Sequence, residues 1–520
     1  MAKILVTEKL AESGLDAMRA AGHEVDVQLD WTPDTLLEII KGKDALVVRS
    51  ATKVIEEVLK AGSDLKVVGR AGVGLDNVDT AAATKLGIMV VNAPESNIIS
   101  AAEHAIALLL SQARNIPQAH GALVQGRWER SKWEGVELFG KTVGIVGLGR
   151  IGALVAQRLS GFGVKLVGYD PYISEDRAKK YGIELMSLEQ LVQVADFVTI
   201  HLPKTKETAG LFGKELLAKV KPGIRIVNAA RGGIIDEESL AEAIREGRVA
   251  GAALDVFSKE PPTDSPLLEQ PSVVVTPHLG ASTGEAQDKA GEQIAEQIIL
   301  ALAGDFVPYA VNISAKSISE QARPYLAVAE QLGHFIAGLF DKLPNELEVE
   351  YQGSLAGEEV SMLTLSVLKG VFASATEEPV SYVNAPQLAS EHGLTIREVQ
   401  STATKGRTSL ITVKGAGHEV SGTLGSDELP RIVSVDGHSI EVPPAPSMLV
   451  VRNNDKPGMI GVVGTILGNA GISIKNMAVG QTAGNETAMM VLSTDPVVPE
   501  QIIVALGKES GILEVHQIIS

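Results

Sequence analysis

The 520-residue chain contains no cysteine and no long apolar run. Without cysteine, disulfides, thiolate chemistry and Cys-based metal sites are excluded, and we assign no metal to the chain. No uninterrupted apolar segment reaches the roughly 18 residues that a membrane span needs. The N-terminal residues MAKILVT enter a strand-like run without the layout of a signal peptide. We therefore expect a cytoplasmic protein with no membrane contact.

Positive charge is also in deficit. Lys and Arg total 46 against 64 Asp and Glu, which gives a formal net charge of −18. This balance argues against nucleic acid as a partner, because phosphate backbones require a basic surface. A local basic pocket for a small anion remains compatible with it.

The remaining composition is that of an ordinary globular protein with sizeable cores. Hydrophobic residues make up 45% of the chain and charged residues 21%. At about 150 residues per domain, the length suggests three or four domains.

Residues 143–170 carry the strongest local pattern. A short apolar strand at 143–146 precedes Gly147, Gly149 and Gly152, a helix is expected from about 150 to 160, and a second strand at 164–169 ends in Asp170. This order is typical of a dinucleotide site: the glycines allow a tight turn, close approach of a pyrophosphate and close helix packing, while the acid meets the ribose. The alternative is a glycine-rich turn that binds no ligand, since the chain has 52 glycines. The strand, the helix and the acid together favour the dinucleotide site.

The first 97 residues alternate strands and helices. Strands are expected at residues 3–6, 24–27, 45–48, 66–69 and 88–91, which predicts a parallel, doubly wound sheet. Ligands gather at the carboxyl ends of such strands. Arg49 and Ser50 follow the third strand, and Arg70 and the loop 71–74 follow the fourth, so they form a candidate anion cradle. Alternatively, the two arginines are ordinary surface charges.

The rest of the chain divides further. A helix from about residue 100 leads into a second strand–helix series, with strands at 197–201, 224–227, 251–256 and 272–275, and a helix at 282–303 returns to the first domain. Residues 314–446 mix a helix at 319–340 with strand-like runs. Residues 447–520 follow the order strand, helix, strand, strand, helix, strand, which suits a split βαβ sandwich. Pro443, Pro444 and Pro446 predict a stiff linker before it.

Three side chains after the dinucleotide unit fall where strands should end: Arg231, Glu260 and His278. A nicotinamide dehydrogenase acting on a 2-hydroxy acid needs such a set. A guanidinium binds the carboxylate bidentately, an imidazole takes the hydroxyl proton, and a carboxylate orients the imidazole. Each residue could also have a purely structural role, and Glu260 could simply cap the turn before Pro261 and Pro262.

Several segments together resemble a known family. They read GRAGVGLDNVD (69–79), VGLGRIG (146–152), HLPKTKETAG (201–210), NAARGGIIDEESL (228–240), LDVFSKEPP (254–262) and TPHLGASTGEAQ (276–287). The chain resembles the D-isomer-specific 2-hydroxyacid dehydrogenases, and most closely their long, phosphoglycerate-oxidising members. The resemblance of these segments covers about the first 310 residues.

That resemblance implies an α/β fold. Two doubly wound parallel-sheet domains, one substrate-binding and one Rossmann-type and NAD-binding, would precede an α+β intervening domain and a ferredoxin-like βαββαβ ACT domain. The implied boundaries are 1–97 plus 282–314 for the substrate domain, 98–281 for the NAD domain, 315–446 for the intervening domain and 447–520 for the ACT domain.

The resemblance also implies the roles of site residues. Arg231, Glu260 and His278 would be catalytic. The substrate and its phosphate would meet Arg49, Ser50, Arg70, Val73, Gly74 and Asn97. NAD would be lined by Gly147, Gly149, Arg150, Ile151, Gly152, Asp170, His201, Thr208, Ala229, Ala230, Asp255 and Gly280. For His201, a structural histidine at a strand end is the alternative.

The implied activity is NAD-dependent oxidation of D-3-phosphoglycerate to 3-phosphooxypyruvate, the first step of L-serine biosynthesis. The alternatives are a reductase of the glyoxylate or hydroxypyruvate type, and a non-catalytic NAD-sensing protein. The ACT module, recognised by the turn NNDKPG (453–458), implies a homotetramer and an L-serine site at Asp455 and Ser473. Serine-inhibited members usually carry Asn where Ser473 stands, so an ACT pair used only for assembly is the alternative.

Overall fold

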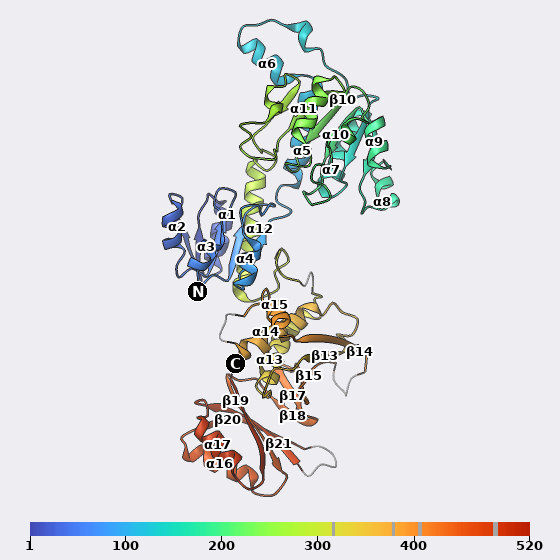
Figure 1. Cartoon of the computed structure of the whole chain (residues 1–520). Helices are drawn as coiled ribbons and strands as arrows, with labels where there is room; N and C mark the ends of the chain where they lie inside the picture. Colours follow the sequence, from blue (N-terminus) through green and yellow to red (C-terminus); the bar gives the residue numbers. More distant parts are fainter. Residues whose placement is uncertain (315–317, 377–379, 404–407, 482–486, 520) are drawn as a thin grey trace.

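The computed structural model describes residues 1–314, 318–376, 380–403, 408–481 and 487–519. Four units follow one another along an elongated molecule, with the dinucleotide sheet at one end and the C-terminal unit at the other (Figure 1). Within these residues, none of the helices is long and apolar enough to cross a membrane. The predicted domain boundary at residue 315 lies outside the described residues.

The first unit is a five-stranded parallel sheet in the order β2-β1-β3-β4-β5. α1 and α12 cover one face, where Met18 and Ile294 join one core, and α2, α3 and α4 cover the other. Gly14 and Gly291 let α1 and α12 approach closely, since a Cβ on Gly14 would lie 2.5 Å from the Gly291 carbonyl oxygen. The elements are β1 (Lys3–Val6), α1 (Glu12–Ala20), β2 (Glu24–Val27), α2 (Pro33–Ile39), β3 (Ala45–Val48), α3 (Glu56–Ala61), β4 (Val67–Arg70), α4 (Thr80–Lys85), β5 (Met89–Asn92) and the returning α12 (Gly284–Ala303).

The second unit is a seven-stranded parallel sheet in the order β12-β11-β10-β9-β6-β7-β8. The strand order reverses between β6 and β9, which is where a doubly wound sheet opens a ligand crevice. The predicted Rossmann-type fold is confirmed. The elements are α5 (Ile98–Ala113), α6 (Ile116–Val124), η1 (Arg130–Trp133), β6 (Thr142–Val146), α7 (Arg150–Leu159), η2 (Ser160–Phe162), β7 (Lys165–Tyr169), α8 (Glu175–Lys180), β8 (Ile183–Leu185), α9 (Leu188–Val194), β9 (Phe197–Ile200), α10 (Lys214–Leu217), β10 (Ile224–Asn228), α11 (Glu237–Arg245), β11 (Val249–Leu254), η3 (Pro266–Glu269) and β12 (Val273–Val275).

The third unit is a six-stranded sheet in the order β14-β13-β15-β16-β17-β18, with α13 and α14 packed on one face. The predicted helix at 319–340 is shorter than expected, because α13 spans Leu326–Ala337 after the 3-10 turn η4 (Arg323–Tyr325). The other elements are β13 (Glu346–Gly353), α14 (Ser361–Ala375), α15 (Ala385–Glu391), β14 (Thr395–Ser401), β15 (Ser409–Gly415), β16 (His418–Leu424), β17 (Pro430–Val435) and β18 (His438–Val442).

The fourth unit has the predicted order of elements and the sheet order β20-β21-β19-β22, which is that of a ferredoxin-like sandwich. Its free sheet face packs into the core of the third unit, where Met448, Val450 and Ile518 join Leu332 and Phe335. The proline-rich linker therefore joins two units that share one core. The elements are β19 (Ser447–Asn454), α16 (Met459–Asn469), β20 (Ser473–Gln481), β21 (Thr487–Asp495), α17 (Glu500–Gly507) and β22 (Ile512–Ile519).

Candidate active site

The three glycines of the dinucleotide turn each meet a different steric demand. Gly147 has φ +97°, and a Cβ there would lie 2.8 Å from the backbone carbon of His201. A Cβ on Gly152 would lie 2.0 Å from the Gly147 carbonyl oxygen, so only glycine lets α7 pack against β6. Gly149 precedes α7 and faces open space. Open space over free helix N–H groups fits a pyrophosphate.

Asp170 holds the same turn from the end of β7. Its Oδ2 accepts a hydrogen bond from the Leu148 N–H at 2.7 Å, and its Oδ1 accepts one from the Tyr172 N–H at 2.9 Å. Each oxygen keeps a lone pair, so the carboxylate can still accept from a ribose diol. Asp170 therefore stands where an NAD ribose would reach it.

Arg150 links the first two units through an ion pair. Its Nη1 lies 2.5 Å from Oε1 of Glu95, which follows β5 of the first unit. The guanidinium that the family resemblance assigned to the cofactor is thus paired with a carboxylate of the first unit. Its predicted neighbour Ile151 is partly buried against the core between α5 and α7.

His278 and Glu260 form a pair. His278 Nδ1 lies 2.8 Å from Glu260 Oε2, and the two side chains are 50% and 38% exposed. The other carboxylate oxygen of Glu260 accepts a hydrogen bond from the Phe257 N–H at 3.1 Å. Glu260 therefore caps its own turn and also orients the imidazole. A carboxylate on Nδ1 leaves Nε2 free to exchange a proton with a substrate.

A buried aspartate at the end of β11 shapes the loop that carries His278. Asp255 is fully buried, and its carboxylate accepts hydrogen bonds from the Thr276 hydroxyl at 2.6 Å and from the N–H groups of Leu279 at 2.7 Å and Gly280 at 2.8 Å. Burial acts to raise the pKa of this carboxyl, but hydrogen bonds from His104, Thr276 and Leu279 lower it overall. Asp255 and Gly280 thus lie together beside His278, and their contact with NAD stays a prediction.

His104 is a site residue that sequence reasoning missed. Its Nε2 lies 3.1 Å from Asp255 Oδ1 and 3.1 Å from the Thr276 hydroxyl. It stands on α5, the helix that enters the second unit from the first. A polar residue inside an apolar helix was the one available signal, because no spacing links it to partners some 150 residues later.

Arg231 follows β10 and points toward the first unit. Its Nη1 donates to the Ala230 carbonyl at 2.8 Å, and Asn228 holds the turn by donating to the Arg231 carbonyl at 2.9 Å. Its Nη2 lies 3.5 Å from the position that a Cβ on Gly74 would occupy. The guanidinium therefore faces the loop that the family resemblance assigned to the substrate.

Arg49 and Arg70, the two arginines of the predicted anion cradle, both belong to the carboxyl-end loops and strand ends of the first unit, and their contact with an anion stays a prediction. The carboxylate of Glu8 accepts hydrogen bonds at 2.9 Å from the N–H groups of Arg49 and Thr52, which fixes the loop after β3. Burial, reinforced by the nearby charges of Arg231 and Arg49, lowers the pKa of the Arg70 guanidinium. Arg70 Nε is buried without a hydrogen-bond partner among the described residues. A buried, unpaired N–H among like charges is the environment that an anion would complete.

The other predicted substrate residues lie in different environments. The Val73 carbonyl accepts a hydrogen bond from Asn92 at 2.8 Å, which anchors the loop. Asn97 precedes α5, and its Oδ1 is buried without a partner in the described part of the chain. Ser50 is exposed beside Arg49.

The remaining predicted cofactor residues follow the carboxyl ends of β9 and β10. Burial lowers the pKa of His201 to about 4, and its Nε2 lies 2.9 Å from the Thr199 hydroxyl, so the ring is neutral at pH 7 and structurally engaged. Thr208 donates to the Pro203 carbonyl at 2.7 Å. Ala229 and Ala230 follow β10 directly and are partly buried.

The two predicted effector residues are not brought together within one chain. Asp455 accepts a hydrogen bond from Gln481, at the C-terminal end of β20. Ser473 begins β20 and pairs with Asp495, at the opposite end of the strand. A site using both residues would have to form between two chains.

Comparison with known proteins places this site in a class. Residues 106–280 match the family model described as D-isomer specific 2-hydroxyacid dehydrogenase, NAD binding domain. A solved structure from Thermus thermophilus is 34% identical, with a TM-score of 0.55, and covers 59% of this chain and 99% of its own. A D-lactate dehydrogenase from Aquifex aeolicus, solved with NAD and lactic acid, is 27% identical, with a TM-score of 0.51, and covers 58% of this chain and 96% of its own. Fold and site define a D-isomer-specific 2-hydroxyacid dehydrogenase that uses NAD.

The C-terminal half narrows the assignment. Residues 321–436 match the D-3-phosphoglycerate dehydrogenase intervening domain, and residues 447–511 match the ACT domain. The D-3-phosphoglycerate dehydrogenase of Mycobacterium tuberculosis is 49% identical over 97% of this chain and 96% of its own. The chain belongs to the D-3-phosphoglycerate dehydrogenase family.

Proposed function

We propose that the chain oxidises D-3-phosphoglycerate at C2 to 3-phosphooxypyruvate with NAD, the first step of L-serine biosynthesis. The observation that carries this proposal is the arrangement of the crevice. A His278–Glu260 pair and Arg231 come from the dinucleotide unit, and the Arg231 guanidinium lies against the loop at Gly74 of the first unit, close enough to Arg70 for their charges to interact. Because substrate and cofactor are charged metabolites of the cytoplasm, we expect the enzyme there.

Each side chain has a distinct task in this proposal. Arg231, with the N–H groups of Val73 and Gly74, binds the substrate carboxylate and fixes the C2 hydroxyl near His278. Nε2 of His278 accepts the hydroxyl proton, and Glu260 stabilises the imidazolium that forms. Arg49 and Arg70 bind the phosphate. NAD, bound over the N-terminus of α7, would be the hydride acceptor.

A turnover assay tests the activity. NADH formation from D-3-phosphoglycerate should exceed that from D-lactate, and the reverse reaction should favour 3-phosphooxypyruvate over glyoxylate and hydroxypyruvate. Preference for the unphosphorylated acids would support the reductase alternative. NAD binding without turnover of any of them would support the non-catalytic alternative.

Cofactor choice should depend on Asp170. Its carboxylate would repel a 2′-phosphate, and the following Pro171 and Tyr172 offer no cation. We expect kcat/KM with NAD to exceed that with NADP by about tenfold or more, since ~1.4 kcal/mol of repulsion already gives that factor. Asp170→Ser should narrow the gap, whereas Asp176→Ser, on exposed α8, should not. Comparable efficiency of the wild-type enzyme with both cofactors would refute the assignment.

Phosphate recognition should depend on Arg49. Arg49→Ala should raise the KM for D-3-phosphoglycerate by about 10- to 100-fold, the value of a hydrogen bond between charged groups. The KM for an unphosphorylated 2-hydroxy acid should change far less. Lys53→Ala, which removes an exposed cation four residues away, is the matched control. Equal effects on both substrates would assign Arg49 to the carboxylate or to folding.

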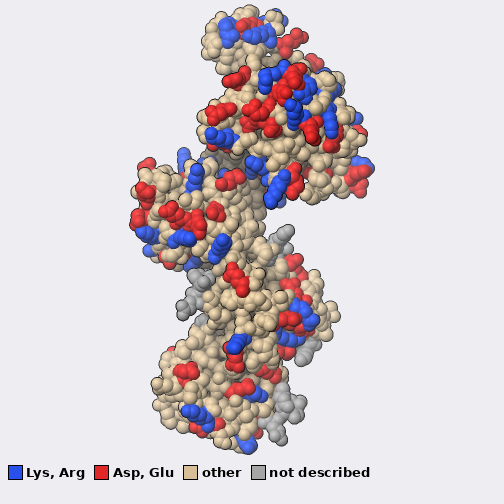
Figure 2. Space-filling model, viewed as in Figure 1, with Lys and Arg blue, Asp and Glu red and all other residues tan. Residues whose placement is uncertain are grey.

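Two separate surfaces support a homotetramer. α6 and the loop after it project from the dinucleotide unit (Figure 1) and expose Leu123, Val124 and Trp128 by 56%, 73% and 81%. In the ACT unit, β20 is an edge strand of the sheet, and charged side chains are sparse over this unit on the face drawn in Figure 2. Two self-associating surfaces can close a tetramer of two-fold contacts. If L-serine binds between paired ACT units, its effect on catalysis is a coupling between two sites.

Light scattering tests this assembly. The full chain should be a tetramer, and removal of residues 315–520 should leave an active dimer. This dimer should be less stable to heat, because the truncation also removes Val383 from the first unit's core. Trp128→Asp in the full chain should likewise convert the tetramer into dimers. A monomeric truncation, or a Trp128→Asp tetramer, would contradict this arrangement.

A further inference from the structure

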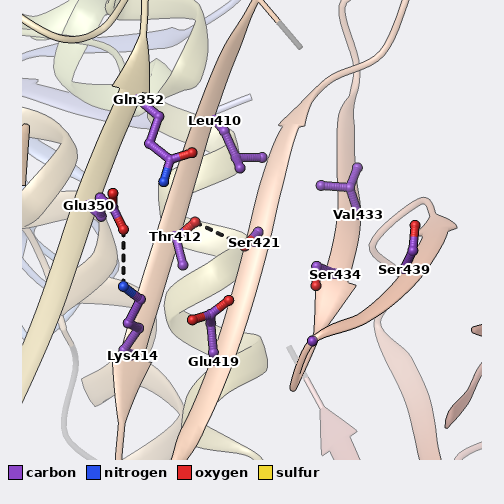
Figure 3. A pocket seen from close by; sticks show the side chains of 11 residues that line it. Glu350, Gln352, Leu410, Thr412, Lys414, Glu419, Ser421, Val433, Ser434 and Ser439 are labelled. Carbon is purple, nitrogen blue, oxygen red and sulfur yellow. Dashed lines mark hydrogen bonds and ion pairs between the residues drawn. The ribbon is translucent and has the colours of Figure 1, made fainter. Parts of the chain in front are cut away.

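A cavity of ≈ 490 Å³ opens on the face of the intervening sheet that lies away from α13 and α14. Five strands, β13 and β15 to β18, contribute its lining (Figure 3). Alternation along the strands decides which side chains face it. On β15, Ile411 and Val413 point into the core, whereas Leu410, Thr412 and Lys414 line the cavity. The volume lies within the range of small-molecule sites.

The floor of the cavity is a pair of buried hydroxyls. Thr412 and Ser421 are each 3% exposed, and their oxygens lie 2.9 Å apart. The pair has two O–H groups and uses only one of them internally. No second acceptor bonds this pair within the described part of the chain, so one donor is available to an occupant of the cavity. Buried hydroxyls without a full set of partners are costly, which indicates that the site is built to be filled by polar groups.

The wall of the cavity carries an excess negative charge. Lys414 Nζ lies 3.0 Å from Glu348 Oε1 and 3.0 Å from Glu350 Oε2, and Arg397 pairs with Glu348 and with Glu346, so the two cations are already shared among three carboxylates. Glu419 stands directly opposite Lys414 in the strand register, yet no ion pair joins the two. Its carboxylate points into the cavity in Figure 3 and has no hydrogen bond or ion pair to the described residues.

We propose that this cavity binds a small polar metabolite that carries a primary ammonium group, such as a free amino acid or an amino alcohol. The ammonium group would pair with Glu419, a lining charge that no described residue compensates. Oxygen atoms of the ligand would accept from the Thr412–Ser421 pair and from the third N–H of Lys414. An anion without an ammonium group would be repelled by Glu350 and Glu419. This site is separate from the crevice and from Asp455 and Ser473.

Binding to the full-length enzyme tests the proposal, by calorimetry and by the rise in thermal midpoint that a ligand of the folded state produces. Glycine, L-glutamine and ethanolamine would be compared with glycolate and ethylene glycol, which lack the ammonium group. We expect binding of at least one ammonium compound and none of the last two. Binding of ethanolamine would identify amino alcohols as the ligand class. Binding of glycine or L-glutamine alone would identify amino acids as the ligand class.

Two conservative variants locate the binding. Glu419→Gln and Thr412→Val should each weaken it by about tenfold or more, the value of one hydrogen bond involving a charge or a buried donor. Glu391→Gln, at an exposed helix end of the same unit, should leave it unchanged, and all three should keep wild-type turnover of D-3-phosphoglycerate. The proposal is overturned if none of the three ammonium compounds binds the wild-type enzyme at millimolar concentration. It is equally overturned if glycolate binds as well as glycine, or if binding survives Glu419→Gln.

Discussion

His278→Ala should slow turnover by about 10²- to 10⁴-fold, the usual contribution of a positioned general acid–base group. The fold of the loop should survive, because the Asp255 carboxylate and the backbone hold it and the imidazole does not. The affinity for NAD should therefore change little. Transient kinetics of NADH formation and fluorescence titration with NADH measure the two quantities separately.

Glu260→Gln is a milder variant that tests the same pair of residues. An amide can still accept from Nδ1 of His278 but does not stabilise the imidazolium, so the loss of kcat should be smaller than that in His278→Ala. Near wild-type turnover of His278→Ala would mean that another group exchanges the proton, and the proposed mechanism would have to be abandoned.

Arg231→Ala should lower kcat/KM for D-3-phosphoglycerate by about 10²- to 10³-fold. Truncating one partner of a buried charge pair costs ~2–5 kcal/mol, and ~1.4 kcal/mol corresponds to a factor of ten. Arg231→Lys should recover only part of this loss, because a single ammonium cannot bind the carboxylate bidentately. Arg245→Ala, on the exposed end of α11, controls for the loss of a positive charge.

The pattern of the loss is informative as well. Arg231→Ala should lower kcat/KM for unphosphorylated 2-hydroxy acids by the same factor as for D-3-phosphoglycerate, since both carry the same carboxylate. Arg49→Ala should discriminate between them. If Arg231→Ala spared the unphosphorylated acids, the assignment of carboxylate and phosphate to the two arginines would be reversed.

Local chemistry made the dinucleotide turn predictable from sequence. Gly147 needs its positive φ within the turn, Gly152 packs against the Gly147 carbonyl five residues earlier, and Asp170 bonds to the turn that precedes its own strand. Such short-range constraints leave a readable spacing. The parallel sheets were predictable for a related reason, because each buried strand is a continuous apolar run.

The catalytic pair was not derivable in this way. His278 meets Glu260 because buried Asp255 folds the loop at residues 276–280 back over the end of β11, and no periodicity encodes that contact. Resemblance to a family supplied it. His104 shows the same limit, since its partners follow 151 and 172 residues later.

Some elements escaped prediction for identifiable reasons. β8 has only three residues, with Glu184 exposed at its centre, so it offers no apolar run. Ten residues of α14 are buried, and a helix that is apolar all round shows no amphipathic period. Pro443, Pro444 and Pro446 predicted a stiff linker but not the core shared across it, because a linker's composition carries no information about which faces pack together.

The core shared by the third and fourth units has a consequence for how such chains can be rebuilt. Excision of the ACT unit at the prolines would strip Met448, Val450 and Ile518 from Leu332 and Phe335 and leave two apolar faces open to water. The smallest piece that can be transplanted between enzymes is therefore the pair of units together. A chimera that exchanges residues 318–519 as one piece keeps this core intact, whereas one joined at the prolines divides it.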